Sequence, residues 1–276
     1  EFMENHKSVI TGNIEGHLTV WDLGSSKKLF SRKVFRDSIV DAKFSLSNNF
    51  LFVASDDGKM KLYKINRQRG LKLIKATRQP DCLISSVLLL DHLGLLLISG
   101  KYEISIWDIK TFQRKDKITA VVSNFIYIPK YNCVAVSLDT GWVKLYDIRT
   151  TKTMGSIEAA RTEGTLKHMV FIEKDDLFIF LENEKVKCWK FTGRSFQFVI
   201  RIKFNYEVFS VAPINRENHL LFSTGDKSLL TLNLKTWEVE RFGELNFKAS
   251  FFKFSSRSKI MAICNSISSE VYILSY

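Results

Sequence analysis

A bulky apolar residue, most often an aromatic one, returns at a nearly constant interval along this 276-residue chain. Each of these anchors stands near the end of one six-residue pattern, as in Leu18-Thr19-Val20-Trp21-Asp22-Leu23. The seven anchors are Trp21, Tyr63, Trp107, Tyr146, Trp189, Leu232 and Leu274. The intervals between them are 42, 44, 39, 43, 43 and 42 residues. A period in this range indicates that one supersecondary unit is copied along the whole chain.

The second repeat shows what one unit contains. Alternating apolar and polar residues predict strands over 39–44, 50–54, 60–65 and 71–74. The second and third of these strands are joined by Ser55-Asp56-Asp57-Gly58, a typical tight-turn sequence. Four antiparallel strands in one short repeat are typical of a β-propeller blade. We therefore predict an all-β, seven-bladed propeller, with blades at about 3–36, 37–80, 81–119, 120–160, 161–206, 207–246 and 247–276.

Several short motifs resemble those of the WD40-repeat family. Trp21-Asp22 and Trp107-Asp108 match its name-giving dipeptide, and the 55–58 turn matches its usual turn between the second and third strands. The resemblance covers essentially the whole chain and implies a scaffold that assembles protein complexes. The family's Gly-His dipeptide is absent before the first strand of every repeat, because Gly16-His17 falls in a turn. The family's buried Asp-His-Ser/Thr-Trp network is therefore expected to be incomplete in every blade, which makes the chain a divergent member.

The first and last blades are expected to be incomplete. Glu1-Phe2 resembles a cloning scar, and the first repeat is expected to begin at its second strand, 8–11. The last repeat provides a third strand, 271–276, and no fourth. The missing innermost strand of the first blade and outermost strand of the last have two candidate sources. They are native residues upstream of the chain, or another polypeptide that pairs with the exposed edge. A third alternative is a ring that stays open.

Composition is that of a soluble globular protein, with 45% apolar and 25% charged residues. The longest apolar run, 87–90, is too short for a membrane span. The four cysteines are expected to be mostly buried free thiols, and no N-glycosylation sequence occurs. Both features favour an intracellular compartment, the cytoplasm or the nucleus. The cysteines are Cys82, Cys133, Cys188 and Cys264.

No pattern in the sequence indicates catalysis. The five histidines have no metal-ligand spacing to a cysteine or to one another. Phosphate-binding glycine loops, nucleophile elbows and HExxH motifs do not occur. Glu173, Asp175 and Asp176 resemble paired carboxylates, but their position predicts a solvated turn. We therefore expect a non-enzymatic protein with no catalytic residue, metal or cofactor.

The formal net charge of +12 is concentrated in two runs that contain no acidic residue. We call their members the basic flank: Lys27, Lys28, Arg32, Lys33, Lys59, Lys61, Lys64, Arg67, Arg69, Lys72, Lys75 and Arg78. They are expected on the outer strands and loops of the first two blades. Three interpretations are open. The residues keep edge strands solvated, they bind phosphates of RNA, DNA or anionic lipid, or they dock an acidic protein.

Loops that enter each first strand are expected to line the narrower face, where this family often binds peptides. The residues there are Arg36, Asp37, Asp81, Ser123, Lys167, His168, Glu207 and Lys248. Two functions are predicted, in order of preference. The first is a scaffold that binds proteins, as a monomeric subunit of a hetero-complex. The alternative is an RNA-associated propeller of ribosome assembly or RNA processing that uses the basic flank.

Overall fold

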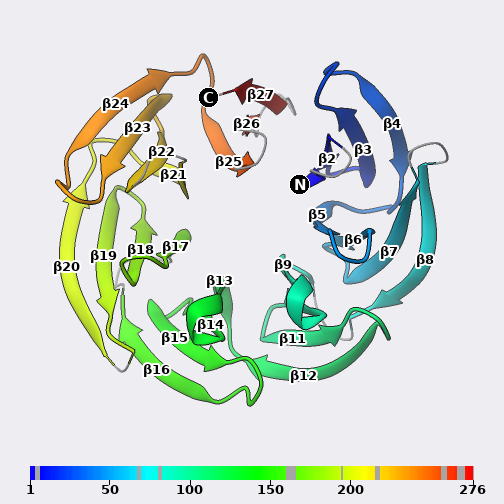
Figure 1. The fold of residues 1–276 in the computed structure, drawn as a ribbon, viewed down its shortest axis with the longest axis horizontal. Coiled ribbons are helices and arrows are strands. Elements are labelled where there is room, and N and C mark those ends of the chain that lie inside the picture. The colour runs from blue at the N-terminus through cyan, green and yellow to red at the C-terminus, as the bar shows by residue number, and fades with distance from the viewer. Residues whose placement is uncertain are drawn as a thin grey trace. The chain divides into compact units, whose positions relative to one another are not determined.

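The structure is a computed structural model that describes residues 1–3, 7–66, 70–79, 83–159, 166–193, 195–214, 218–255, 260–265 and 271–275. The chain forms two compact units, Glu1–Val122 and Ser123–Tyr276, and each is described by itself. In both units the chain folds into successive antiparallel sheets (Figure 1). Each sheet contains strands that are consecutive in the sequence, so each sheet is one meander.

The first unit contains three sheets of four strands each. The first sheet consists of β1 (Phe2–Met3), β2 (Ser8–Gly12), β3 (His17–Asp22) and β4 (Lys28–Lys33). The second consists of β5 (Ile39–Ser45), β6 (Phe50–Ser55), β7 (Lys59–Asn66) and β8 (Gly70–Arg78). The third consists of β9 (Ser86–Leu90), β10 (Leu95–Ser99), β11 (Glu103–Asp108) and β12 (Gln113–Thr119), with the short 3₁₀ helix η2 (Asp91–Leu93) after β9.

The second unit contains the remaining four sheets. The fourth sheet consists of β13 (Val122–Ile128), β14 (Cys133–Leu138), β15 (Trp142–Asp147) and β16 (Thr153–Glu158), with η3 (Pro129–Tyr131) after β13. The fifth consists of β17 (His168–Ile172), β18 (Leu177–Glu182), β19 (Lys185–Phe191) and β20 (Phe196–Lys203). The sixth consists of β21 (Val208–Pro213), β22 (His219–Thr224), β23 (Ser228–Asn233) and β24 (Val239–Glu244). The seventh has three strands, β25 (Ala249–Ser255), β26 (Ile260–Asn265) and β27 (Val271–Ser275).

Burial explains why the strands of one sheet differ in composition. All six residues of β18 are buried, and its sequence is the continuous apolar run Leu-Phe-Ile-Phe-Leu followed by Glu. Such a run is typical of a strand that is covered on both faces. The fourth strand β4 is mostly exposed and carries basic residues, which discourage pairing with other chains. The hydrophobic core therefore lies between consecutive sheets, as with Leu51 of the second sheet and Leu18 of the first.

The structure confirms the strands predicted for the second repeat. Observed strands β5 to β8 contain all four predicted segments, and the 55–58 turn closes with a bond from the Gly58 N–H to the Ser55 carbonyl of 3.1 Å. The predicted count of seven blades is corrected by the structure. Six sheets are complete, four-stranded blades, and the seventh sheet has only three strands.

The prediction of an incomplete first blade is wrong. Phe2 pairs with Val9 and Met3 with Ser8, so β1 supplies the missing first strand. The Met3 side chain is buried, and Ile10 exchanges two backbone bonds with Glu1, of 2.8 and 2.9 Å. The residues set aside as a cloning scar thus contribute to the sheet. A two-residue strand is too short for an alternation pattern to reveal.

In the third sheet, a buried polar chain fixes the position of one sheet against its neighbour. The Trp107 indole N–H donates to Ser105 Oγ at 2.8 Å, and Ser105 Oγ donates to Gln79 Oε1 at 2.9 Å. Gln79 directly follows β8 of the second sheet, in the segment where the WD40 pattern has its histidine. The expectation of an incomplete network is therefore refined: three members are present here, with glutamine in the histidine position.

Lysine performs the same task in two other sheets. Lys61 and Lys187 stand two residues before their anchors, as Ser105 does. Lys61 Nζ donates to the Val34 carbonyl at 2.5 Å, and Lys187 Nζ donates to the Ala159 carbonyl at 2.9 Å. Val34 and Ala159 are each the first residue after the fourth strand of the preceding sheet. One position in the repeat thus connects consecutive sheets, by a hydroxyl or by an ammonium group.

The two described thiols match the prediction for cysteines. Cys133 and Cys188 are free and buried, and burial raises the pKa of each to about 12. Cys82 and the side chain of Cys264 lie outside the described part of the chain. None of the helices that the structure describes has the length and hydropathy needed to cross a bilayer.

Candidate functional site

Described members of the basic flank occupy the third and fourth strands of the second sheet and the fourth strand of the first. In the second sheet, Lys59 pairs with Arg78 and Lys64 with Lys72 across β7 and β8. Like charges directly opposite each other are unfavourable in a sheet. Lys28, Arg32 and Lys33 lie on β4 and Lys27 in the turn before it, whereas Arg67 and Arg69 lie outside the described residues.

The two basic runs meet where the first sheet contacts the second. Arg32 Nη1 on β4 donates to the Leu71 carbonyl on β8 at 3.2 Å. Lys61 Nζ lies 4.8 Å from the centre of the Phe35 ring, in addition to its bond with Val34. Burial and the neighbouring Lys59 and Arg32 hold the pKa of the Lys61 ammonium below its usual value. Arg32 and Lys61 are thus engaged with atoms of the protein itself.

Two further members of the flank have internal partners. Lys59 forms ion pairs with Asp57 and, at 4.0 Å, with Asp37. Lys75 Nζ donates to the Thr111 carbonyl of the third sheet at 2.8 Å. The exposed members for which the structure shows no such contact within the described residues are Lys27, Lys28, Lys33, Lys64, Lys72 and Arg78. The surface offered to an external anion is therefore smaller than the sequence alone indicates.

The loops that enter the first strands were expected to line one face, and the structure shows contacts for only some of their residues. In the second unit, Lys167 forms an ion pair with Glu207, and the Lys167 carbonyl accepts a 3.4 Å bond from Asn124 Nδ2. Burial lowers the pKa of the adjacent His168. Ser123 and Lys248 are exposed. In the first unit, Arg36 is exposed and Asp37 faces Lys59, while Asp81 lies outside the described residues.

Sequence reasoning missed a group of exposed apolar side chains at one end of the third sheet. Leu83 precedes β9, Tyr102 lies in the turn between β10 and β11, and Val121 follows β12. Their exposed fractions are 64%, 56% and 41%. Backbone bonds from Ala120 N to Tyr102 O (3.0 Å) and from Ser85 N to Ser99 O (2.9 Å) tie the loops together. We call Leu83, Tyr102 and Val121 the apolar edge.

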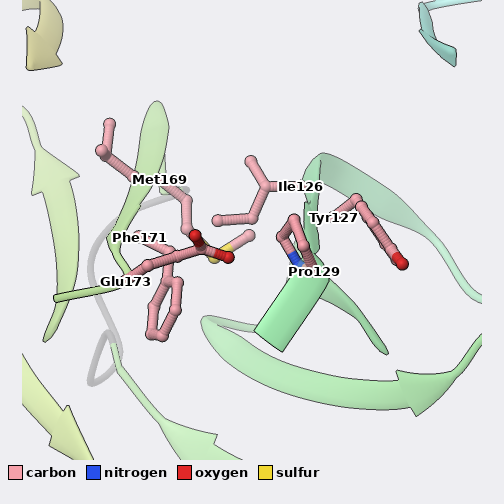
Figure 2. A pocket seen from close by; sticks show the side chains of 7 residues that line it. Ile126, Tyr127, Pro129, Met169, Phe171 and Glu173 are labelled. Carbon is pink, nitrogen blue, oxygen red and sulfur yellow. The ribbon is translucent and has the colours of Figure 1, made fainter. Parts of the chain in front are cut away.

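A pocket of about 460 Å³ lies between the first strands of the fourth and fifth sheets, β13 and β17 (Figure 2). It also escaped prediction, since its walls come from two segments that lie 40 or more positions apart in the sequence. Six of the seven lining residues are apolar or aromatic, and Glu173 supplies a carboxylate. The lining consists of Ile126, Tyr127, Pro129, Met169, Val170, Phe171 and Glu173.

The acidic turn beside this pocket is more than a solvated connection. Asp176 accepts bonds from Lys130 Nζ (2.7 Å) and from the Tyr131 hydroxyl (2.8 Å), both on η3 between β13 and β14 of the fourth sheet. Burial opposes ionisation of Asp176, but these two hydrogen bonds outweigh it and hold the pKa of that carboxyl below its usual value. Glu173 remains exposed at the rim of the pocket, where it accepts a 3.3 Å bond from the Lys130 N–H. The turn therefore connects two sheets and also faces a ligand-sized space.

Groups of His, Cys, Asp and Glu that could hold a metal ion do not occur among the described residues. The described residues form an exposed apolar edge, a basic flank with few free cations, and an apolar pocket with one carboxylate. Surfaces of this kind bind other molecules by burial and charge.

Comparison with known proteins identifies the fold. The chain resembles the β-propeller domain of Cps50 (Swd1) from Myceliophteria thermophila with a TM-score of 0.82. The match covers 100% of this chain and 96% of the other, at 12% sequence identity. At that identity the likeness shows the fold, which is a β-propeller. No family model matches the chain, in keeping with its divergence.

Two curated proteins are similar over shorter segments. ASTRA-associated protein 1 of Candida glabrata is 30% identical over 73 residues, which are 26% of this chain. Eukaryotic translation initiation factor 3 subunit I of Bombyx mori is 34% identical over 89 residues, which are 32% of this chain. The matched segments span 14% and 27% of the length of those two relatives.

Proposed function

We propose that this divergent WD40-type β-propeller is a non-enzymatic scaffold that holds other proteins together within a complex. The observation that carries the proposal is the apolar edge, where three large apolar side chains stand in solvent on neighbouring loops. Exposed apolar side chains gathered at one end of a sheet make that end a candidate interaction site. Burying Leu83, Tyr102 and Val121 against a partner would remove from water the surface that the fold leaves exposed.

Hydrogen bonds between consecutive sheets support a framework of fixed shape in each unit. In the first unit, which carries the apolar edge, Ser105 and Lys61 make such bonds, and Lys187 makes one in the second unit. Loops on such a framework keep their positions, so a partner meets a preformed surface. The names of the two curated relatives, a subunit and an associated protein, support assembly as the role. The buried free thiols support a reducing, intracellular location.

A tagged chain purified from its source cells tests this proposal. We expect a protein partner that stays bound in high salt and after ribonuclease treatment, because apolar burial does not depend on phosphates. The variant L83S/Y102S/V121S should lose that partner. A matched control, L29S/L73S/I74S, changes three exposed apolar residues on β4 and β8 and should keep it.

The outcome that contradicts the scaffold favours the RNA-associated alternative. It is recovery of nucleic acid instead of protein, with binding that falls steeply as salt rises. Reversing the charges of Lys64, Lys72 and Arg78 would then abolish binding, because these side chains remain exposed on the second sheet.

A further inference from the structure

The pocket between β13 and β17 has the chemistry of a receptor for one kind of side-chain pair. We infer that it binds a large apolar side chain of a partner polypeptide that is followed directly by arginine or lysine. The inference rests on the proposed scaffold function and names the chemistry of one partner segment. The pocket lies wholly within the second unit and is distinct from the apolar edge of the first.

The floor of the pocket is apolar and continuous with the core. Met169 is buried, and Ile126 and Phe171 pack against the cluster between the fourth and fifth sheets. The Phe171 ring lies 4.7 Å from the Phe178 ring and 6.3 Å from the Tyr131 ring, measured between centroids. A side chain that enters here therefore meets an apolar surface whose shape is set by packed rings, and its burial is favourable.

The rim carries one charge that an apolar ligand alone would leave unused. Glu173 is the charged residue of the lining, and Figure 2 shows its side chain extending from the β17 side toward Ile126. Asp176, three residues further on, is already matched by Lys130. On a chain with a net charge of +12, a carboxylate at the mouth of an apolar pocket selects for a cation.

The walls are held in place before any ligand arrives. Lys130 bridges the two sheets through Nζ to Asp176 and through its N–H to Glu173. The Tyr127 hydroxyl donates to Asn132 Oδ1 at 2.9 Å, which fixes the β13 side. A preformed site loses less freedom on binding than a mobile one.

The open mouth favours a segment of polypeptide over a free small molecule. Small-molecule pockets enclose most of the ligand surface. Here Pro129 and Glu173 are exposed at the rim. Only one or two side chains would be covered, and the rest of the ligand would lie across the surface, as a bound peptide segment does.

The probe is the peptide acetyl-Ser-Gly-Leu-Arg-Gly-Ser-amide, titrated into the full chain with ¹³C-labelled methionine and isoleucine methyls. We expect saturable shifts of the Met169 and Ile126 methyl signals. Replacing Leu by Ala in the peptide should weaken binding by roughly tenfold, because apolar area is lost. Replacing Arg by its neutral isostere citrulline should weaken binding by roughly threefold to fivefold, the range of an exposed ion pair.

Two variants of the chain separate the carboxylate of the pocket from general acidity. Glu173→Gln should weaken binding of the Arg peptide by roughly the same threefold to fivefold and should leave binding of the citrulline peptide unchanged. Asp175→Asn also removes one negative charge from this turn, but Asp175 is not part of the pocket lining. The affinity of this variant for both peptides should therefore stay within about twofold of the wild-type affinity. No saturable shift, or equal effects of the two variants, would overturn the inference.

Failure here and failure of the scaffold give different results. If the peptide does not bind while the tagged chain still retains a partner through the apolar edge, only the pocket assignment is lost. If no protein is retained but the peptide binds, the pocket remains and the scaffold proposal is wrong.

Discussion

The ion pair between Lys187 and Glu182 gives the sharpest prediction on how the sheets are connected. Lys187 Nζ lies 2.8 Å from Glu182 Oε1 and 2.9 Å from the Ala159 carbonyl. The two side chains are only 15% and 12% exposed. Lys187→Met leaves a nearly buried carboxylate without its cation and a buried carbonyl without its donor. Loss of one partner of a buried pair costs 3–5 kcal/mol, so with this residual exposure we expect about 2–3 kcal/mol.

The double variant Lys187→Met/Glu182→Met separates the charge from the packing. Once both charges are gone, only the Ala159 carbonyl is left without its donor, which costs about 1 kcal/mol. The double variant should therefore be more stable than Lys187→Met alone. Glu182→Met completes the double-mutant cycle, with an expected coupling of about 2 kcal/mol.

Urea unfolding followed by tryptophan fluorescence measures these differences. The control is Arg241→Met, which removes a pair whose side chains are 59% and 61% exposed, with an expected cost below about 0.5 kcal/mol. If Lys187→Met costs no more than this control, or if the double variant is the least stable of the set, the role assigned to Lys187 is refuted.

Three further predictions follow from the buried polar groups. Ser105→Ala leaves the Trp107 N–H and the Gln79 amide without their partner, so unfolding free energy should fall by about 1–3 kcal/mol in urea titration; a change below about 0.5 kcal/mol would contradict this. Cys133 and Cys188, with pKa values of about 12, should not react with a thiol reagent at pH 8 until urea is added. Peptide mapping measures this, and labelled Cys133 or Cys188 in the native protein would contradict it. The pKa of Asp176 is lower in the folded state, so its stabilisation is complete above the unfolded pKa of about 3.9 and is lost as pH falls below it. The urea midpoint should therefore fall less steeply with decreasing pH below about 4 in Asp176→Asn than in the wild type, and an equal slope would contradict the assignment.

The sequence predicts the repeat well because its period follows from packing. Anchors such as Trp107 and Tyr63 are buried between two sheets, although Trp21 of the first repeat is 37% exposed. Strand β1 could not be predicted, since two residues carry no alternation. The sequence shows that no histidine precedes the third repeat. It does not show that Gln79 takes the histidine's place, because that depends on Ser105 lying within hydrogen-bond distance.

The candidate sites were harder to predict than the fold for a physical reason. Lys61, Lys75 and Arg32 look free in a sequence, yet each reaches a carbonyl on a neighbouring sheet or on the connection from it. Such contacts depend on how sheets face each other, which periodicity does not encode. The pocket is a similar case, because Ile126 and Phe171 belong to different repeats and each alone resembles an ordinary core residue.

The fifth sheet shows the cost of exchanging one residue type at a fixed position. Lys187 occupies the place that Ser105 holds in the third sheet, so Trp189 lacks the hydroxyl that Trp107 uses. Among the described residues, Trp189 Nε1 has no hydrogen-bond partner, and an unsatisfied buried donor costs about 1–3 kcal/mol. Lys187 instead forms the ion pair with Glu182 and the hydrogen bond to the Ala159 carbonyl.

If the chain binds proteins through the apolar edge of its third sheet, loss of that edge should release the partner. Co-purification tests this with the wild-type chain, with L83S/Y102S/V121S and with L29S/L73S/I74S, at equal salt and after ribonuclease. We expect a stoichiometric protein partner on the wild-type chain and on L29S/L73S/I74S, and none on L83S/Y102S/V121S. A partner retained equally by all three, or nucleic acid recovered in place of protein, would contradict it.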